Sequence, residues 1–464
     1  MDEFTNYFPW TPERLAHIDD KQLDVLLAPG PGIPQDQSEP ITNLAIKLNQ
    51  LQGRPLKLNR YLGRQALLKW YKTKAYSIYN LESFFSCLEH RFKLIPDNEQ
   101  KNGFNLIGYS RGTLGLGEDL RAMATLLRAR GIPFAVYHIG HPSDSPEEYD
   151  MSEESAELLF STSVVFLNAI EAEKFLNLFQ EYLPYLGFKV IIPPWELPEA
   201  PAQWESAFAE FDEVWCMSDF VAKAYEGLHN NLISVPPVVI PPSKSDHADK
   251  RQHRAFTFLY IFDAGSYLTR KNPEAVVKSF LQAFASSNEP VRLVLKVSNW
   301  QINSQTKALE SLIKLDSRIS LITENYSSDE MNALWDSCSC YVSLHRSEGF
   351  GRTIAEAASR GIPIVCTGWS GNVDITGQDY PLLVDYQLIA VEEGEYPHFS
   401  GQHWADVDVN DGAAKLHWVF TNRNTSELAT ITAALQLRFE TCFSLQSPGR
   451  RIESLYSAIT KSKS

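Results

Sequence analysis

Long apolar runs and the pattern of a signal peptide are both missing from this sequence. No apolar run among the 464 residues approaches the roughly 18 that a membrane-spanning helix requires. The first ten residues, MDEFTNYFPW, are acidic and lack the basic and apolar regions of a secretory signal peptide. We therefore predict a cytoplasmic protein.

Cysteine is also scarce, with six residues scattered along the chain at positions 87, 216, 338, 340, 366 and 442. Cys338 and Cys340 form one C-x-C pair, but no second pair or histidine cluster accompanies it, as a structural zinc site would require. Isolated cysteines of this kind are typically small buried apolar residues. The sequence predicts neither a metal centre nor a disulfide framework.

Basic residues are outnumbered, with 42 Lys and Arg against 57 Asp and Glu and a net charge of −15. A nucleic-acid-binding protein usually presents a basic face, so this balance argues against nucleic acid as a partner. Residues 40–81 are the exception, because they contain no acidic residue. Their basic residues are Lys47, Arg54, Lys57, Arg60, Arg64, Lys69, Lys72 and Lys74. Two interpretations stay open: a solvated helix face, or a peripheral contact with the inner face of a membrane or a lipid-linked acceptor.

Length and composition predict a globular protein of two or three domains. The chain is 44% hydrophobic and 12% aromatic, which suffices for a full core in each domain. A composition shift near residue 97 and a proline-rich, polar connector over 236–254 mark the boundaries. We predict a helical extension over 1–100, α/β domains over 101–245 and 246–445, and a closing helix over 446–464.

The first α/β half alternates strands and helices from residue 104 onward. Gly115 and Gly117 lie in a turn before a helix that ends near Arg130, but Leu120 stands where a third glycine would complete a dinucleotide-binding fingerprint. Trp195 and Glu196 follow a strand at 189–192. Trp195 is interpreted either as a ring that stacks on a sugar, with Glu196 contacting acceptor hydroxyls, or as a packed residue beside a rim carboxylate.

The second half opens with a strand at 256–262 and then presents two adjacent cations. Arg270 and Lys271 precede a helix predicted over 273–285, where a guanidinium fork and an ammonium would neutralise a diphosphate. Lys296, near the end of a strand at 293–297, is a further phosphate candidate. Exposed Arg-Lys pairs are common, so this pattern alone is a weak indication.

The most informative stretch runs from 341 to 374 and predicts a strand, a glycine turn, a helix over 353–359 and a second strand. Gly349 and Gly351 let backbone N–H groups at a helix N-terminus approach a pyrophosphate. Glu348 and Glu356 flank the turn. Because carboxylates repel phosphate, we interpret them as acceptors for sugar and ribose hydroxyls, with ordinary helix carboxylates as the alternative.

A six-residue acidic segment over 406–411 raises a metal interpretation. Its glycine, Gly412, falls one position late for a calcium loop, and no bidentate glutamate follows at the required spacing. The segment also contains D-x-D, a pattern that binds metal ions in some enzymes. We favour helix capping before residues 413–420.

The motif E-G-F-G-x-x-x-x-E, followed by A-x-x-x-G-x-P-I-V, resembles the nucleotide-sugar site of retaining GT-B glycosyltransferases of family 4. With HRSEGFG before it and TGWSGNVD after it, the stretch resembles the bacterial surface-polysaccharide branch. The resemblance implies that Glu348 contacts the donor sugar, that Glu356 holds the ribose, and that Arg270 and Lys271 stabilise the leaving diphosphate. It also implies a donor-binding set that contains Gly115, Gly117, Lys296, Asn325, His345, Gly349, Phe350, Gly351, Arg352 and Thr353.

On that resemblance we expect two Rossmann-like domains that face each other across a cleft, with the last helix crossing back to the first domain. The expected reaction is transfer of a hexose or deoxyhexose, mannosyl-type donors included, from a nucleotide diphosphate sugar to a growing bacterial polysaccharide or lipid-linked glycan. The donor β-phosphate would help to take the acceptor proton, without a metal or cofactor. His345 is either a ligand of a sugar hydroxyl or a structural residue. Two alternatives stay open: a non-catalytic nucleotide-sugar- or glycan-binding subunit, and a nucleotide-sugar epimerase of related fold.

Overall fold

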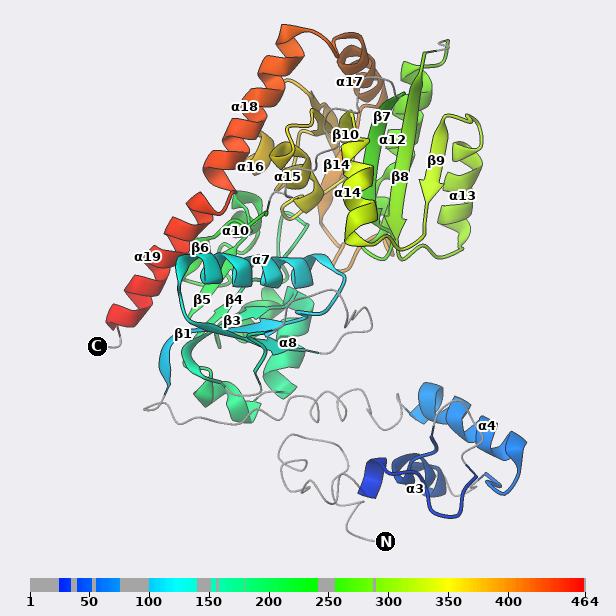
Figure 1. The fold of residues 1–464 in the computed structure, drawn as a ribbon, viewed down its shortest axis with the longest axis vertical. Coiled ribbons are helices and arrows are strands. Elements are labelled where there is room, and N and C mark those ends of the chain that lie inside the picture. The colour runs from blue at the N-terminus through cyan, green and yellow to red at the C-terminus, as the bar shows by residue number, and fades with distance from the viewer. Residues whose placement is uncertain are drawn as a thin grey trace.

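Two six-stranded parallel sheets form the bulk of the computed structural model (Figure 1). It describes residues 25–34, 40–51, 56–75, 100–139, 152–155, 158–178, 180–240, 255–286 and 289–462. The predicted boundary at 245/246, most of the proline-rich connector beyond Ile240, Arg54, Cys87 and much of the predicted extension lie outside the described residues.

The first sheet has the strand order β2-β1-β3-β4-β5-β6, with every neighbouring pair parallel. Parallel strands need crossover connections, and the helices that supply them cover the sheet. The strands are β1 (Lys101–Gly108), β2 (Phe134–His138), β3 (Phe160–Phe166), β4 (Phe188–Ile191), β5 (Glu213–Cys216) and β6 (Leu232–Ser234).

The second sheet has the order β12-β11-β10-β7-β8-β9 and is also parallel throughout. Counted along the chain, this is the doubly wound order 3-2-1-4-5-6, which reverses direction between β7 and β10. Ligands of such sheets bind where the order reverses, at the carboxyl ends of the strands. The strands are β7 (Phe256–Asp263), β8 (Val291–Ser298), β9 (Ile319–Ile322), β10 (Cys340–Ser343), β11 (Ile364–Thr367) and β12 (Leu383–Val384).

Helices flank both sheets, and an antiparallel hairpin of β13 (Tyr386–Ala390) and β14 (His403–Val407) extends the second domain. The first domain contains α7 (Gly115–Arg130), α8 (Ala169–Leu178), α9 (Glu205–Phe208), α10 (Asp219–Ala224) and 3-10 turns over Gln180–Tyr185 and Ala202–Trp204. The second contains α11 (Leu268–Lys271), α12 (Pro273–Ala283), α13 (Ser304–Ile313), α14 (Ser328–Asp336), α15 (Arg352–Ser359), α16 (Val373–Thr376), α17 (Val409–Thr421) and α18 (Ser426–Cys442).

Local chemistry accounts for many of the helix ends. Ser218 accepts a hydrogen bond from Val221 N–H and caps α10, while Pro273 stands at the first position of α12. Asp408 accepts from the N–H groups of Asn410 and Asp411 at the start of α17. The acidic segment therefore caps a helix as predicted, although α17 begins four residues before Ala413.

The described part of the N-terminal extension contains α3 (Asn43–Leu51) and α4 (Tyr61–Trp70), which continues as a short π-helix over Tyr71–Ala75. Figure 1 shows α3 and α4 side by side and apart from both sheets. No helix within the described ranges is long and apolar enough to cross a bilayer.

The last helix, α19 (Gln446–Ser462), runs from the second domain onto α7 of the first (Figure 1). Arg130 fixes this crossing, because its guanidinium lies 3.2 Å from Glu453 Oε1 and donates to the carbonyl of Leu445 at 3.0 Å. The ring of Tyr456 packs on Phe104 of β1, with 5.4 Å between centroids. One continuous helix thus joins the two cores.

Candidate active site

The loops that follow β7 and β10 meet where the strand order of the second sheet reverses. The loop after β7 is held by Asp263, which accepts hydrogen bonds from Gly265 N–H and from the side chain of Asn299, both at 2.8 Å. It leads into the short helix α11, which ends with Arg270 and Lys271. The loop after β10 carries His345 and Glu348, so the fold brings both charged segments to one edge.

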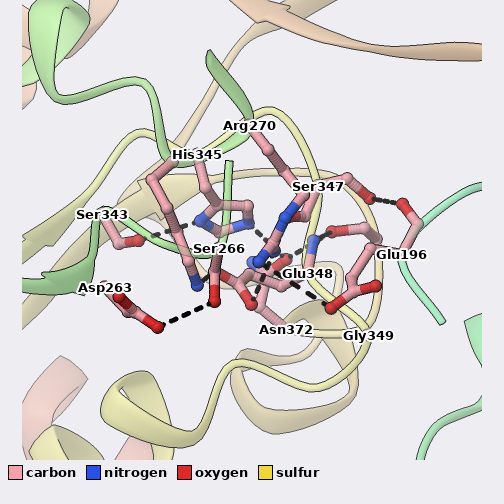
Figure 2. Close-up of polar contacts among 12 residues, drawn as sticks. Glu196, Asp263, Ser266, Arg270, Ser343, His345, Ser347, Glu348, Gly349 and Asn372 are labelled. Carbon is pink, nitrogen blue, oxygen red and sulfur yellow. Dashed lines mark hydrogen bonds and ion pairs between the residues drawn. The ribbon is translucent and has the colours of Figure 1, made fainter. Parts of the chain in front are cut away.

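Glu348 lies between two cations (Figure 2). Its Oε1 accepts from Lys271 Nζ at 2.5 Å, and its Oε2 lies 3.3 Å from Arg270 Nη1. Arg270 also donates to the carbonyl of Ser347 at 2.9 Å, and its side chain is only 3% exposed. The Arg270 Nε is buried and has no hydrogen-bond partner within the described part of the chain. One buried N–H donor of the cluster therefore has no acceptor among the described residues.

The electrostatics of this cluster favour the charged forms of Glu348 and Arg270. Burial alone would raise the pKa of Glu348, but Lys271 and Arg270 outweigh it and lower that pKa to about 2. Burial and the neighbouring Arg270 lower the pKa of Lys271, whereas Glu348 and Glu196 hold the pKa of Arg270 above its usual range despite burial. The carboxylate is thus ionised throughout the neutral range and shared by two cations.

The first domain contributes Glu196 to the same cluster (Figure 2). Its Oε1 lies 3.8 Å from Arg270 Nη2, its Oε2 accepts from the hydroxyl of Tyr396, and its backbone carbonyl accepts from Ser347 Oγ. Tyr396 lies in the segment between β13 and β14, and its ring centroid is 5.9 Å from the Arg270 guanidinium carbon. Residues of both domains therefore build one charged centre.

The glycine turn also touches the first domain. Ser218 Oγ donates to the carbonyl of Gly349 at 2.5 Å, and a Cβ placed on Gly349 would lie 2.7 Å from the carbonyl oxygen of Trp195. Only glycine fits there, because the two backbones are in contact. Phe350 is buried against Phe443, with 5.6 Å between centroids, and Gly351 adopts a φ of +91° before α15.

Trp195 is a packed residue and not an exposed platform for a sugar. Its side chain is 2% exposed, and its indole N–H donates to the carbonyl of Glu199 at 3.0 Å. Edge-on contacts with Trp204 and Tyr396 complete its surroundings. Of the two interpretations of this tryptophan, the structure supports packing, because the segment between β13 and β14 covers the ring.

His345 is likewise structural. The Asn372 amide donates to the carbonyl of Thr367, so its Oδ1 faces the imidazole and accepts from His345 Nε2 at 2.9 Å. Nδ1 then accepts from Ser343 Oγ at 2.9 Å. Burial lowers the pKa of His345 to about 4, which keeps the ring neutral. Both nitrogens are occupied, so neither is available to a sugar hydroxyl.

Helix α15 carries three of the predicted donor-binding side chains. Arg352 pairs with Asp119 of α7, and the hydroxyl of Thr353 accepts from Tyr341 at 2.7 Å. Burial, with added repulsion from Glu118 and Asp119, raises the pKa of Glu356 to about 7 although Arg352 and Arg360 oppose the change. Arg352 thus links the two domains, and burial gives Glu356 a pKa close to neutral pH.

The remaining predicted residues belong to other elements of the structure. Gly115 and Gly117 occupy the first turn of α7 instead of a preceding loop, and a Cβ on Gly117 would meet the carbonyl of Gly112 at 2.4 Å. Lys296 is near the end of β8 with its ammonium 5.1 Å from the ring of Tyr326, and Asn325 is exposed beyond β9. These two residues lie on the side of β7 opposite to β10.

Several polar residues of the site were missed by sequence reasoning. Ser370 Oγ accepts from Glu348 N–H at 2.9 Å, and Asn372 orients His345. Both belong to the segment T-G-W-S-G-N-V-D, whose two glycines and short polar residues were a usable indication of a second ligand-side turn. No sequence pattern pointed to Tyr396 or Asp119. Within the described ranges, no group of three or more His, Cys, Asp or Glu could hold a metal ion.

Residues 260–391 match the family model described as glycosyl transferases group 1. The matched residues include Arg270, Lys271, Glu348 and Glu356. This part of the protein is therefore similar to group 1 glycosyltransferases. The predicted enzyme class, a glycosyltransferase, is confirmed at that level.

Two solved structures with TM-scores above 0.5 confirm the predicted GT-B fold. A sucrose-phosphate synthase from Thermosynechococcus elongatus aligns with a TM-score of 0.55 and 13% identity, over 78% of this chain and 100% of that chain. A glycosyltransferase from Rickettsia africae gives 0.51 and 13% over the same shares. TarM from S. aureus gives 0.47 and 12%, and the alignment covers 63% of this chain but only 55% of TarM. The sequence matches none of the curated proteins with which it was compared.

Proposed function

We propose that this glycosyltransferase is a retaining enzyme of family 4. It transfers a hexose or deoxyhexose, mannosyl-type sugars included, from a nucleotide diphosphate sugar to a bacterial polysaccharide or lipid-linked glycan. One observation carries the proposal: Glu348, Arg270 and Lys271 converge where the strand order reverses, and Glu196 of the first domain completes the cluster.

The chemistry of this cluster suits a leaving diphosphate. Arg270 and Lys271 neutralise its charge, and the unoccupied Nε of Arg270 supplies a further donor. A diphosphate that enters displaces the Glu348 carboxylate from Lys271, because two anions cannot share that ammonium without repulsion. Glu348 then accepts hydrogen bonds from hydroxyls of the donor sugar, which fixes the orientation of the sugar relative to its leaving group. Glu356 accepts ribose hydroxyls from the first turns of α15.

The proposal is tested by incubating the protein with UDP-, GDP- and dTDP-sugars and a glycan acceptor and measuring release of nucleotide diphosphate. We expect turnover with at least one donor, and a product whose anomeric configuration by NMR equals that of the donor. Arg270→Ala should lower kcat by about 10²-fold or more, because one charge-stabilising donor is lost. Glu348→Gln should lower kcat to a similar extent. Lys278→Ala, an exposed cation of α12, is the matched control and should keep full activity.

Each alternative has its own signature in this assay. Tight binding of a donor without turnover indicates the non-catalytic binding subunit. Inversion at C2 of the sugar without acceptor indicates the epimerase. Full activity of Glu348→Gln or Arg270→Ala would disprove the assignment of the site while leaving the class intact.

A further inference from the structure

An exposed aromatic ring lies beside the charged cluster, at a position that no motif indicated. Tyr267 is 41% exposed and immediately precedes α11. Its φ is +63°, a region that costs a residue other than glycine about 1–2 kcal/mol. Its carbonyl accepts from Lys271 N–H at 3.1 Å, which ties this conformation to the catalytic loop. Such strain persists mainly where a side chain has a use.

The ring of Tyr267 belongs to an aromatic pair that reaches the acceptor-side carboxylate. Its centroid lies 4.7 Å from that of Tyr396, at an interplanar angle of 58°. Tyr396 is buried and donates its hydroxyl to Glu196, whereas the hydroxyl of Tyr267 has no hydrogen-bond partner among the described residues. The surface therefore presents an apolar ring face next to a carboxylate from the opposite domain.

This combination matches the chemistry of a sugar. A pyranose has an apolar C–H face that packs on an aromatic ring and hydroxyls at its edge that donate to a carboxylate. Glu196 keeps acceptor capacity, since an ionised carboxylate has about four lone-pair sites and Tyr396 uses one of them. Trp195, one candidate for such a platform, is buried, whereas Tyr267 is an exposed ring of the described chain whose aromatic partner contacts Glu196.

We propose that Tyr267 is the stacking platform of the acceptor subsite and that Glu196 binds hydroxyls of the same acceptor sugar. This inference rests on the proposed function, since a transferase needs an acceptor next to its donor. It assigns acceptor recognition in part to the second domain, through a residue of the loop that also positions Arg270 and Lys271. A nucleotide base stacked on Tyr267 is the competing outcome.

The test uses the full-length protein, methyl α- and β-hexopyranosides as acceptor probes, and UDP, GDP and dTDP as donor probes. Glycoside binding is followed by saturation-transfer NMR and nucleotide binding by calorimetry. Tyr267→Gly removes the ring and relaxes the positive φ, so its thermal midpoint should not fall below that of the wild type. Tyr267→Phe keeps the ring. Tyr386→Ala, on β13, removes a similarly exposed tyrosine (37%) and serves as the control.

We expect the wild type, Tyr267→Phe and Tyr386→Ala each to transfer NMR saturation to the C–H protons of at least one glycoside. Tyr267→Gly should lower the affinity for that glycoside by about tenfold, as expected for one lost aromatic contact. Its affinity for nucleotides should be unchanged. Unchanged glycoside binding by Tyr267→Gly would overturn the proposal, and so would a loss confined to nucleotides, which would place a base on this ring. Nucleotide binding without glycoside binding by the wild type refutes the acceptor subsite alone. If neither class of probe binds, the proposed function fails as well.

Discussion

The surroundings of two glutamates eight residues apart shift their pKa values in opposite directions. Glu348 and Glu356 are both largely removed from water, but only Glu348 lies against two cations. Its pKa falls to about 2, whereas burial and nearby carboxylates raise the pKa of Glu356 to about 7. Glu348 is therefore a permanent anion, and Glu356 becomes one only when the pH rises or when donors such as hydroxyls reach it.

The raised pKa of Glu356 predicts a specific pH dependence of stability. Its folded pKa of about 7 exceeds the value near 4.3 in an unfolded chain, so the folded state binds the proton more tightly. Its contribution to stability is complete below pH 4.3 and is lost as the pH rises through 7. Glu356→Gln should therefore be as stable as the wild type near pH 4 and more stable by about 3 kcal/mol at pH 8.

Urea denaturation at both pH values measures this difference, and Glu393→Gln is the control because that carboxylate is exposed. Equal stability of wild type and Glu356→Gln at pH 8 would show that the carboxylate is better solvated than its burial implies. The same variant should bind a nucleotide diphosphate sugar more weakly at pH 8, since glutamine offers fewer acceptor sites to the ribose hydroxyls than the ionised carboxylate.

At the scale of elements, α4 and its π-helical continuation carry the basic character of the extension. Arg64 is 5% exposed and donates to the carbonyl of Leu58 at 2.9 Å, so it stabilises the turn before the helix instead of facing a partner. Arg60, Lys69 and Lys74 are exposed, as are Lys47, Lys57, Lys72 and the apolar side chain of Leu62. A contact with anionic lipid would use exposed cations such as Arg60, Lys69 and Lys74.

If this surface binds a membrane, reversal of Arg60, Lys69 and Lys74 to glutamate should abolish flotation with phosphatidylserine vesicles. About 1 kcal/mol per basic residue near an anionic surface predicts a loss of 10²-fold or more. Wild-type binding should weaken with added salt, because the attraction is screened. Reversal of Lys278, Lys307 and Lys314 in the second domain is the control with the same change of charge. Wild-type protein that does not float would establish the solvated-face interpretation.

Elements with a strong local pattern were predicted from the sequence, and elements that depend on distant contacts were not. The strand, turn and helix around Glu348 follow from glycine, proline and apolar spacing, so α15 begins within one residue of its predicted start. The hairpin of β13 and β14 has no comparable pattern, and its linking segment buries Trp195 with Tyr396, 201 residues later. Gly115 and Gly117 were placed in a loop, although the close approach to Gly112 lets α7 start there.

For the whole molecule, direct polar contacts join the two domains. Ser218 bonds Gly349, the backbone N–H of Asp219 donates to Asp374 at 2.7 Å, and Gln402 donates to the carbonyl of Glu199 at 3.0 Å. These residues are far apart in sequence, and the same residue types occur on any surface. Sequence reasoning therefore places both walls of the site but not the contacts that join them.

The pair of Arg352 and Asp119 tests how strongly the domains are coupled. Both side chains are mostly buried, and Arg352 also points at the carbonyl of Val238 at 3.4 Å. Removing one partner leaves a charge without compensation, which typically costs about 3–5 kcal/mol, whereas replacing both with leucine costs much less.

We expect Arg352→Ala and Asp119→Ala each to accelerate hydrogen exchange in α7 and α15 and to expand the protein in solution scattering. The variant with leucine at both positions should exchange more slowly than either. Because a two-domain chain need not unfold in one step, local hydrogen exchange is a better measure than a single thermal midpoint.

The control is Arg128→Ala, which breaks an exposed ion pair between α7 and Glu153. It should change hydrogen exchange by no more than the equivalent of about 1 kcal/mol. If Arg352→Ala behaves like Arg128→Ala, α19 and the segment between β13 and β14 hold the domains together without this pair.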